Sequence, residues 1–146
     1  MTTVILVRHG EKVAGAPKFN DDPPLTPEGE ARASLLARML AKSDVTTIYT
    51  TPFTRTRSTA APIAKVLGLT PIEVKPGPTF AEDMAEKIRA LPAGSTVLVV
   101  GHSNTTPNVM KALGIANAPT IDDATEFDNL FVVTLGETPQ MLALKF

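Results

Sequence analysis

Two short, continuous apolar segments constrain the fold of this chain most: residues 3–7 (TVILV) and 96–100 (TVLVV). Both are rich in β-branched residues and lack the polar–apolar alternation of a strand that is exposed on one face. They therefore predict strands that are covered on both faces. Such strands are typical of parallel sheets with helices on either side, which indicates an α/β fold.

Other segments alternate between strand and helix patterns. Weaker strands are expected at residues 45–49 and 72–75, and two further strands at residues 130–135 and 141–146. Helices are expected at residues 27–42, 53–67, 81–91 and 107–113. The last two strands flank the short loop 136–139, which is typical of a hairpin. The pattern predicts one domain over residues 1–146: a three-layer α/β sandwich with a mainly parallel sheet, helices on both faces and a C-terminal antiparallel hairpin.

Local signals support these helix boundaries. Thr26, Thr51 and Thr106 each precede a proline, and they predict helix starts because threonine caps free N–H groups and proline suits the first turn. Gly68 and Gly114 are expected just past helix ends. The Pro- and Asp-rich segment 14–24 has no periodicity and predicts a flap near the end of the first strand.

Composition limits the class of protein. There is no cysteine, which excludes disulfides and thiolate metal sites, and the net charge of −1 disfavours an extended nucleic-acid interface. No apolar run approaches the roughly 20 residues of a membrane-spanning helix, and the N-terminus lacks the basic stretch of a signal peptide. We therefore expect a cytoplasmic protein that binds neither nucleic acid nor membrane, although a removed leader would leave no trace here. The oligomeric state is not indicated.

The chain has only two histidines, and each follows one of the two strong strands. His9 comes after residues 3–7, and His102 comes after residues 96–100. Ligands of open α/β sheets bind outside the carboxyl ends of the strands, so two parallel strands would present both imidazoles on one rim. Two unrelated loop histidines are the alternative, and the matching positions disfavour it.

Arginines accompany these histidines. Arg8 adjoins His9, and Arg55 and Arg57 lie in residues 51–60 (TPFTRTRSTA), just after an expected strand. Guanidinium groups match phosphate oxygens in a bidentate manner, and helix starts after the strands also favour an anion. The residues predict a phosphate-binding rim, with Arg57 equally compatible with an ordinary surface position.

Four ordered motifs carry a family resemblance: residues 8–11 (RHGE), 24–29 (PLTPEG), 51–60 and 99–103 (VVGHS). Together they resemble the histidine phosphatase (phosphoglycerate mutase-like) superfamily, and the chain resembles its small, single-domain bacterial members. Thr51 stands where the family usually has serine, and the region after Ile115 matches poorly.

The resemblance implies roles by position. His9 would be the nucleophile that becomes phosphorylated, while Arg8, Arg55 and His102 would bind the phosphoryl oxygens. Gly10 would let the backbone approach the phosphate. Neighbouring guanidinium charges should lower the pKa of His9, which favours the neutral form that attack requires.

Ser103 and several acidic residues are further candidates for the site. Ser103 is expected to touch the phosphate, to cap the next helix, or both. The leaving oxygen needs a proton, and Glu82 is our choice of general acid because the family often supplies an acid from this segment. The competing acids are Asp83, Glu11 and the pair Asp122 and Asp123.

The implied activity is metal-independent hydrolysis of phosphomonoesters through a phosphohistidine, with no cofactor and with a small phosphorylated substrate or a phosphoprotein as partner. The alternatives are a phosphohistidine protein phosphatase, a phosphoglycerate-type mutase and a non-catalytic phosphate-binding protein. Mutases of this superfamily are generally longer. A metal hydrolase is disfavoured, because it would need three or more suitably spaced ligands and nearby arginines would repel the metal.

Overall fold

The computed structural model describes residues 1–14 and 22–146. Most of the predicted flap, residues 15–21, therefore lies outside the described residues. Over the described part of the chain, no helix combines the length and apolar composition needed to cross a membrane.

Six strands form a single mixed sheet in the order β3-β2-β4-β1-β5-β6. Their bounds are β1 Thr2–Arg8, β2 Thr47–Thr50, β3 Ile72–Glu73, β4 Thr96–Gly101, β5 Asn129–Leu135 and β6 Gln140–Lys145. The first four strands run parallel, while β5 pairs antiparallel with β1 and β6 pairs antiparallel with β5. The α/β prediction, including the C-terminal hairpin, is confirmed.

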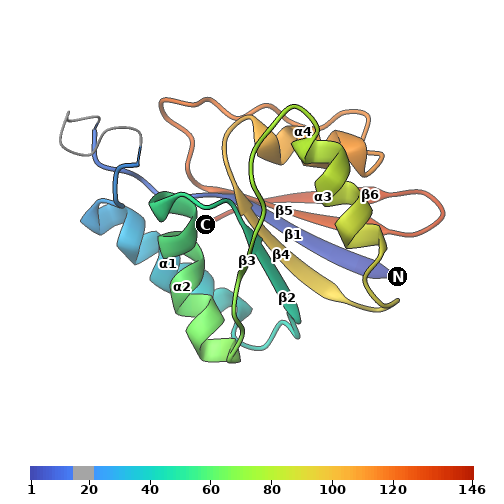
Figure 1. Ribbon diagram of the computed structural model, residues 1–146, viewed down its shortest axis with the longest axis horizontal. Helices are drawn as coiled ribbons and strands as arrows, with labels where there is room; N and C mark the ends of the chain where they lie inside the picture. Colours follow the sequence, from blue (N-terminus) through green and yellow to red (C-terminus); the bar gives the residue numbers. More distant parts are fainter. Residues whose placement is uncertain (15–21) are drawn as a thin grey trace.

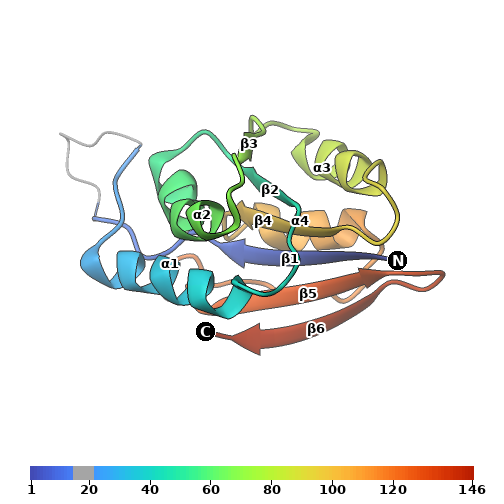
Figure 2. The same cartoon turned by 90° about the horizontal axis from the view of Figure 1, so that it is seen from below.

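Helices cover both faces of this sheet (Figures 1 and 2). Helices α1 (Pro27–Leu40) and α2 (Thr54–Leu67) pack on one face, and α3 (Phe80–Arg89) and α4 (Thr105–Ala112) on the other. Successive β1 side chains enter the two cores in turn: Leu6 joins the α3–α4 side, and Ile5 and Val7 join the α1–α2 side. Burial on both faces explains why this strand lacks alternation in its sequence.

Three predicted helix boundaries agree with the structure and two do not. Gly114 lies just past the end of α4, directly after the C-cap residue Leu113. Thr26 caps α1 by accepting a hydrogen bond from Gly29 N at 3.1 Å, and Gly68 ends α2 in the left-handed conformation. The predicted caps Thr51 and Thr106 are wrong, because α2 has Phe53 at its N-cap and α4 already begins at Thr105.

Asp22 supplies what Thr51 does not. Its carboxylate accepts hydrogen bonds from Thr54 N at 2.7 Å and from Thr54 Oγ1 at 2.8 Å. A carboxylate at this position satisfies a free N–H group and complements the positive end of the helix dipole. The first turn of α2 is therefore capped from 32 residues earlier in the chain, which a local sequence signal cannot reveal.

The backbone after β1 crosses the first turn of α1 at two glycines. A Cβ on Gly10 would lie 2.9 Å from Gly29 O, and a Cβ on Gly29 would overlap Glu11 O. The close approach that the structure shows at Gly10 is thus to the α1 backbone. This contact sets the position of α1 against the segment that carries His9.

We expect Gly29→Ala to lower the free energy of unfolding by roughly 1–3 kcal/mol, because backbone atoms must move to admit the methyl group. Urea unfolding midpoints measure the change. Gly77→Ala is the matched control, since a Cβ there meets nothing within 4 Å. Equal midpoints for the two variants would contradict the proposed close packing.

Candidate active site

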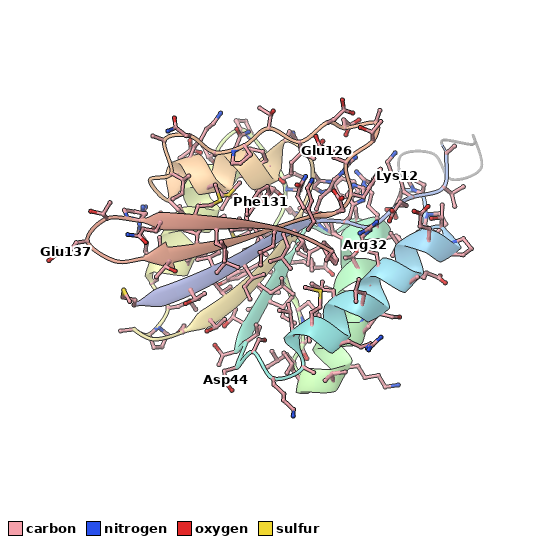
Figure 3. The ribbon with its side chains drawn as sticks, turned by 180° about the vertical axis from the view of Figure 1, so that it is seen from behind. Lys12, Arg32, Asp44, Glu126, Phe131 and Glu137 are labelled. Atoms are coloured by element: carbon pink, nitrogen blue, oxygen red, sulfur yellow. The ribbon has the colours of Figure 1, made fainter. Side chains whose placement is uncertain are left out.

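The two histidines lie side by side at the carboxyl ends of neighbouring strands. Arg8 pairs with Gly101 in the β1–β4 register, and His9 N donates to Gly101 O at 2.9 Å. The His9 and His102 ring centroids are 5.4 Å apart, with the rings in an edge-on arrangement. The strand pattern predicted this shared rim. In Figure 3 this end of the sheet lies toward Lys12 and Arg32, opposite the hairpin tip at Glu137.

His9 is held in one tautomer. Its Nδ1 lies 2.7 Å from Gly10 O. A carbonyl oxygen only accepts hydrogen bonds, so Nδ1 carries the hydrogen and Nε2 keeps its lone pair when the ring is neutral. Burial of His9 lowers its pKa to about 3, with further lowering by the charges of His102, Arg8 and Arg55, against the Gly10 hydrogen bond, which raises it. At neutral pH His9 is an uncharged imidazole with a free Nε2.

His102 makes a different set of contacts. Its Nε2 lies 2.8 Å from Thr51 Oγ1, which in turn lies 2.8 Å from Thr56 Oγ1. Its backbone N–H donates to Thr105 Oγ1 at 2.9 Å. Burial lowers the pKa of His102 to about 4, with further lowering by Arg55 and Arg8. His102 is therefore neutral in the free protein at neutral pH, and a bound anion would raise its pKa.

Arg8 is buried and devotes most of its donors to the loop before β5. Nη1 donates to Glu126 O at 2.8 Å and to Asp122 O at 3.3 Å, while Nη2 donates to Asp123 O at 2.8 Å and to Asp123 Oδ1 at 3.0 Å. Its guanidinium also lies 4.0 Å from the centre of the Phe127 ring. Within the described structure, Nε is buried without a hydrogen-bond partner. With its terminal N–H groups engaged in the loop, Arg8 offers mainly its positive charge to an anion.

The two arginines of residues 51–60 differ. The Arg55 guanidinium lies 4.5 Å from the centre of the Phe53 ring, and its charge lowers the pKa of both His9 and His102. Arg57 is half-exposed and lies 3.6 Å from the carboxylate of Glu73 on β3. Arg55 thus belongs to the electrostatics of the histidine pair, and Arg57 has a surface position.

Among the described acidic residues, Asp123 pairs directly with the buried Arg8. Its carboxylate pairs with Arg8 and accepts from Ser103 Oγ at 2.7 Å. The Ser103 hydrogen bond and the Arg8 charge lower the pKa of Asp123. An acid held in its ionised form is a poor proton donor at neutral pH. Ser103 caps neither α4 nor any other helix among those described, because its hydroxyl is directed to Asp123.

Glu82 lies in the first turn of α3 and is exposed. It lines a hollow of about 570 Å³ between α3 and α4 together with Asn104 and Thr105, two residues that closely follow His102. Its competitor Asp83 accepts a hydrogen bond from Thr79 Oγ1 at 2.9 Å. Glu82 therefore lies across this hollow from the segment that follows His102.

Glu11 is not a surface residue facing water. It forms a bidentate ion pair with Arg32 of α1, with Arg32 Nη2 2.9 Å from Glu11 Oε2. Arg32 Nη1 also donates to Phe146 O. The Arg32 hydrogen bond and charge keep the pKa of Glu11 below its ordinary value, against the effect of burial. This pair ties the segment after His9 to α1.

Thr59 lies in the motif at residues 51–60, and the sequence alone indicated no role for it. Thr59 Oγ1 accepts from Gly10 N at 2.9 Å and donates to Arg55 O at 2.7 Å. One buried hydroxyl thus links the residue after His9 to the helix turn that carries Arg55. The position of Thr59 within the motif at residues 51–60 was the one sequence signal that pointed to this residue.

Both imidazoles make the protein sensitive to acid. The unfolded chain binds protons below about pH 6.5, whereas the folded His9 and His102 resist protonation until about 3 and about 4. The unfolded state therefore becomes more favourable as the pH falls. The free energy of unfolding should be at its highest value above about pH 6.5 and should decrease below it. Urea midpoints measured between about pH 7 and pH 5 test this. His9→Gln should show a weaker decrease, and identical pH profiles would contradict the low pKa of His9.

The arrangement combines a bare, buried imidazole nitrogen with two guanidinium charges and a second imidazole. Phosphoryl transfer depends mainly on positioning and on charge stabilisation around a tetrahedral group, which such a set can supply. Among the described residues, no three His, Asp or Glu side chains form a group that could hold a metal ion.

Comparison with known proteins agrees with this chemistry. A protein of Photorhabdus laumondii named as a phosphoglycerate mutase, GpmB, is 44% identical over 71 residues, which are 47% of this chain and 33% of that protein. The chain thus matches only about a third of that relative's length.

Solved structures share the fold over nearly the whole chain. A protein of Agrobacterium tumefaciens named as a phosphohistidine phosphatase, SixA, superposes with a TM-score of 0.77 at 22% identity, covering 99% of this chain and 98% of its own. A phosphoserine phosphatase of Entamoeba histolytica gives a TM-score of 0.71 at 17% identity, covering 100% and 98%. The model of the histidine phosphatase superfamily (branch 1) matches residues 4–79. The chain belongs to the histidine phosphatase superfamily, branch 1.

Proposed function

We propose that this protein is a phosphatase that hydrolyses phosphomonoesters through a phosphohistidine on His9, without a metal ion. The observation that carries the proposal is the hydrogen bond from His9 Nδ1 to Gly10 O, which leaves Nε2 bare on a ring that lies beside His102 and within the electrostatic influence of Arg8 and Arg55. These groups supply the charge that a metal ion would otherwise provide.

The reaction would run in two displacements. In the first, His9 Nε2 attacks phosphorus, the bond to the ester oxygen breaks, and the leaving oxygen takes a proton from an acid. In the second, water attacks the phosphohistidine and gives a proton to the conjugate base of that acid, the N–P bond breaks, and inorganic phosphate leaves His9 neutral again. The Nδ1 hydrogen bond to Gly10 O persists throughout and holds the ring in line.

Turnover of p-nitrophenyl phosphate in the presence of a chelator tests the proposal. We expect turnover that is unchanged by the chelator and inhibited by vanadate, which occupies the phosphoryl site. Loss of activity on chelation would contradict metal independence. Phosphate binding without turnover would make the protein a binding module.

Glu82 remains our candidate for the general acid, because the Asp123 carboxylate is already paired with Arg8 and hydrogen-bonded to Ser103. We expect Glu82→Gln to lower kcat on an alkyl phosphate by about 100-fold, with little change on p-nitrophenyl phosphate, whose leaving group needs less protonation. Asp83→Asn, one position along the same helix turn, is the matched control. A loss confined to Asp123→Asn would assign the acid to Asp123 instead.

A phosphohistidine-bearing protein is a second candidate substrate, favoured by the full-length similarity to the protein named SixA. An imidazole leaving group takes up a proton near neutral pH by itself, since its pKa is about 6.5. Such a substrate needs less help from an enzyme acid. Retained activity of Glu82→Gln on phosphohistidine, alongside its loss on alkyl phosphates, would show that both substrates use this site.

A mutase is the third candidate, because of the 44% identity to the protein named GpmB. A mutase would return the phosphoryl group of His9 to a sugar acid instead of water. A requirement for a bisphosphorylated sugar acid, together with isomerisation of a phosphoglycerate, would favour this activity over hydrolysis.

A further inference from the structure

A chain of buried hydroxyl groups ends on His102. Thr51 Oγ1 lies 2.8 Å from both His102 Nε2 and Thr56 Oγ1. Thr56 Oγ1 also lies 2.8 Å from Thr51 O and 3.0 Å from Phe53 O. Both threonines are 0% exposed, so water does not compete for these contacts.

Counting hydrogens gives this chain a direction. Carbonyl oxygens only accept, so the single hydroxyl hydrogen of Thr56 goes to the carbonyls of Thr51 and Phe53. Thr56 Oγ1 then accepts from the Thr51 hydroxyl, whose only hydrogen is thereby used. Thr51 Oγ1 must accept from His102 Nε2, which therefore carries a hydrogen. The reverse direction would give up both hydroxyl-to-carbonyl bonds, each worth about 0.5–1.5 kcal/mol.

We propose that Thr51 and Thr56 hold His102 as the tautomer with hydrogen on Nε2, so that the two site imidazoles are opposite tautomers. His9 has hydrogen on Nδ1 and a bare Nε2, whereas His102 has hydrogen on Nε2 and a bare Nδ1. Thr51 and Thr56 are positioning residues in this scheme. The branched side chain of Thr51 also restricts its χ1 angle, which fixes the hydroxyl in place.

The consequence for catalysis rests on the proposed function. A bare Nδ1 would repel a phosphoryl oxygen, so His102 binds the anion only after Nδ1 has taken up a proton. That proton comes from solvent or from a singly protonated phosphoryl group, whose pKa is about 6. The resulting imidazolium donates from both nitrogens, one to the phosphoryl group and one to Thr51, and the hydroxyl chain keeps its direction.

Long-range ¹H–¹⁵N NMR of the uniformly labelled full chain at neutral pH reads both tautomers directly, without substrate. The chain contains only two histidines, so one substitution, His102→Gln, assigns the spectra. We expect opposite patterns, with the bare nitrogen at Nε2 in His9 and at Nδ1 in His102. A His102 with hydrogen on Nδ1, or an exchanging mixture, would overturn the proposal whether or not the protein is a phosphatase.

Three variants test the direction of the hydrogen bonds between Thr56, Thr51 and His102. Thr51→Val keeps the shape but removes the hydroxyl, and should abolish the tautomer preference of His102, whereas Thr51→Ser should preserve it. Thr56→Val removes the acceptor of the Thr51 hydrogen, so Thr51 should donate to Nε2 and invert the His102 tautomer. The tautomer of His9 should be unchanged in all three variants. If both valine variants kept the wild-type NMR pattern of His102, the proposed direction of the hydroxyl hydrogen bonds would be contradicted.

Thr50→Val is the matched control. Thr50 is adjacent in sequence and 1% exposed, but its Oγ1 has no hydrogen-bond partner among the described residues. We expect its His102 pattern to equal that of the wild type. Thr51→Val should also weaken vanadate binding by about 10- to 100-fold, the worth of one hydrogen bond to a charged group, whereas Thr50→Val should not.

Discussion

His9→Ala is expected to lower kcat by at least about 10⁴-fold, because removal of the nucleophile in a covalent mechanism costs up to about 10⁶. The reason is geometric as well as chemical. In the proposed mechanism, the tautomer set by Gly10 O leaves Nε2 of His9 as the attacking atom. Steady-state kinetics on p-nitrophenyl phosphate measure the loss.

Binding of vanadate separates loss of chemistry from loss of the site. The His9→Ala variant keeps Arg8, Arg55 and His102. Calorimetry should therefore show a vanadate affinity within about tenfold of the wild-type value, because a larger loss would correspond to a missing hydrogen bond to a charged group. His102→Ala should instead lose about 100- to 1000-fold in rate, as expected for one oxyanion donor. Turnover of His9→Ala at the wild-type rate would remove His9 from the mechanism.

Arg8→Lys is expected to lower kcat/KM by about 100- to 1000-fold, although the charge is conserved. Arg8 spreads four hydrogen bonds over the backbone of Asp122, Asp123 and Glu126 and the carboxylate of Asp123. An ammonium group has three donors at one point and cannot reproduce this planar fork. The substitution therefore releases the loop before β5 and shifts the positive charge of the proposed phosphate site.

Hydrogen exchange of the loop provides a second measurement. The amides of residues 122–126 should exchange faster in Arg8→Lys, while those of β1 and β4 should be unchanged. Arg57→Lys is the matched control, because Arg57 is half-exposed and has only a 3.6 Å contact with Glu73. We expect its activity to stay within about twofold, since exposed ion pairs are worth about 0–1 kcal/mol. Equal activity of the two lysine variants would contradict the role of Arg8.

The sequence predicted the α/β layers and the meeting of the histidines because both depend on short-range signals. Residues 3–7 and 96–100 read as strands buried on both faces, and parallel pairing of such strands places the residues that follow them side by side. His9 and His102 are those residues. The pairing of Arg8 with Gly101 realises this expectation directly.

Contacts that close over long sequence separations were not predictable. Asp123 reaches Arg8 across 115 residues, and Asp22 caps α2 from 32 residues away. A sequence window around either residue carries no trace of its partner. Thr51 was misread for a related reason: a threonine before proline is a good helix cap, but here His102, 51 residues later, takes its hydroxyl group. The tertiary contact with His102, and not the local signal for a helix cap, determines what the Thr51 hydroxyl group binds.

The most direct test of the account is to trap the phosphoenzyme. The wild-type protein is mixed with ³²P-labelled substrate, quenched in alkali within the first turnover, and digested for peptide mapping. We predict an acid-labile, alkali-stable label on the peptide that contains His9, and none in His9→Ala. Label on any other residue, or turnover through a wild-type enzyme that never becomes labelled, would contradict the central claim.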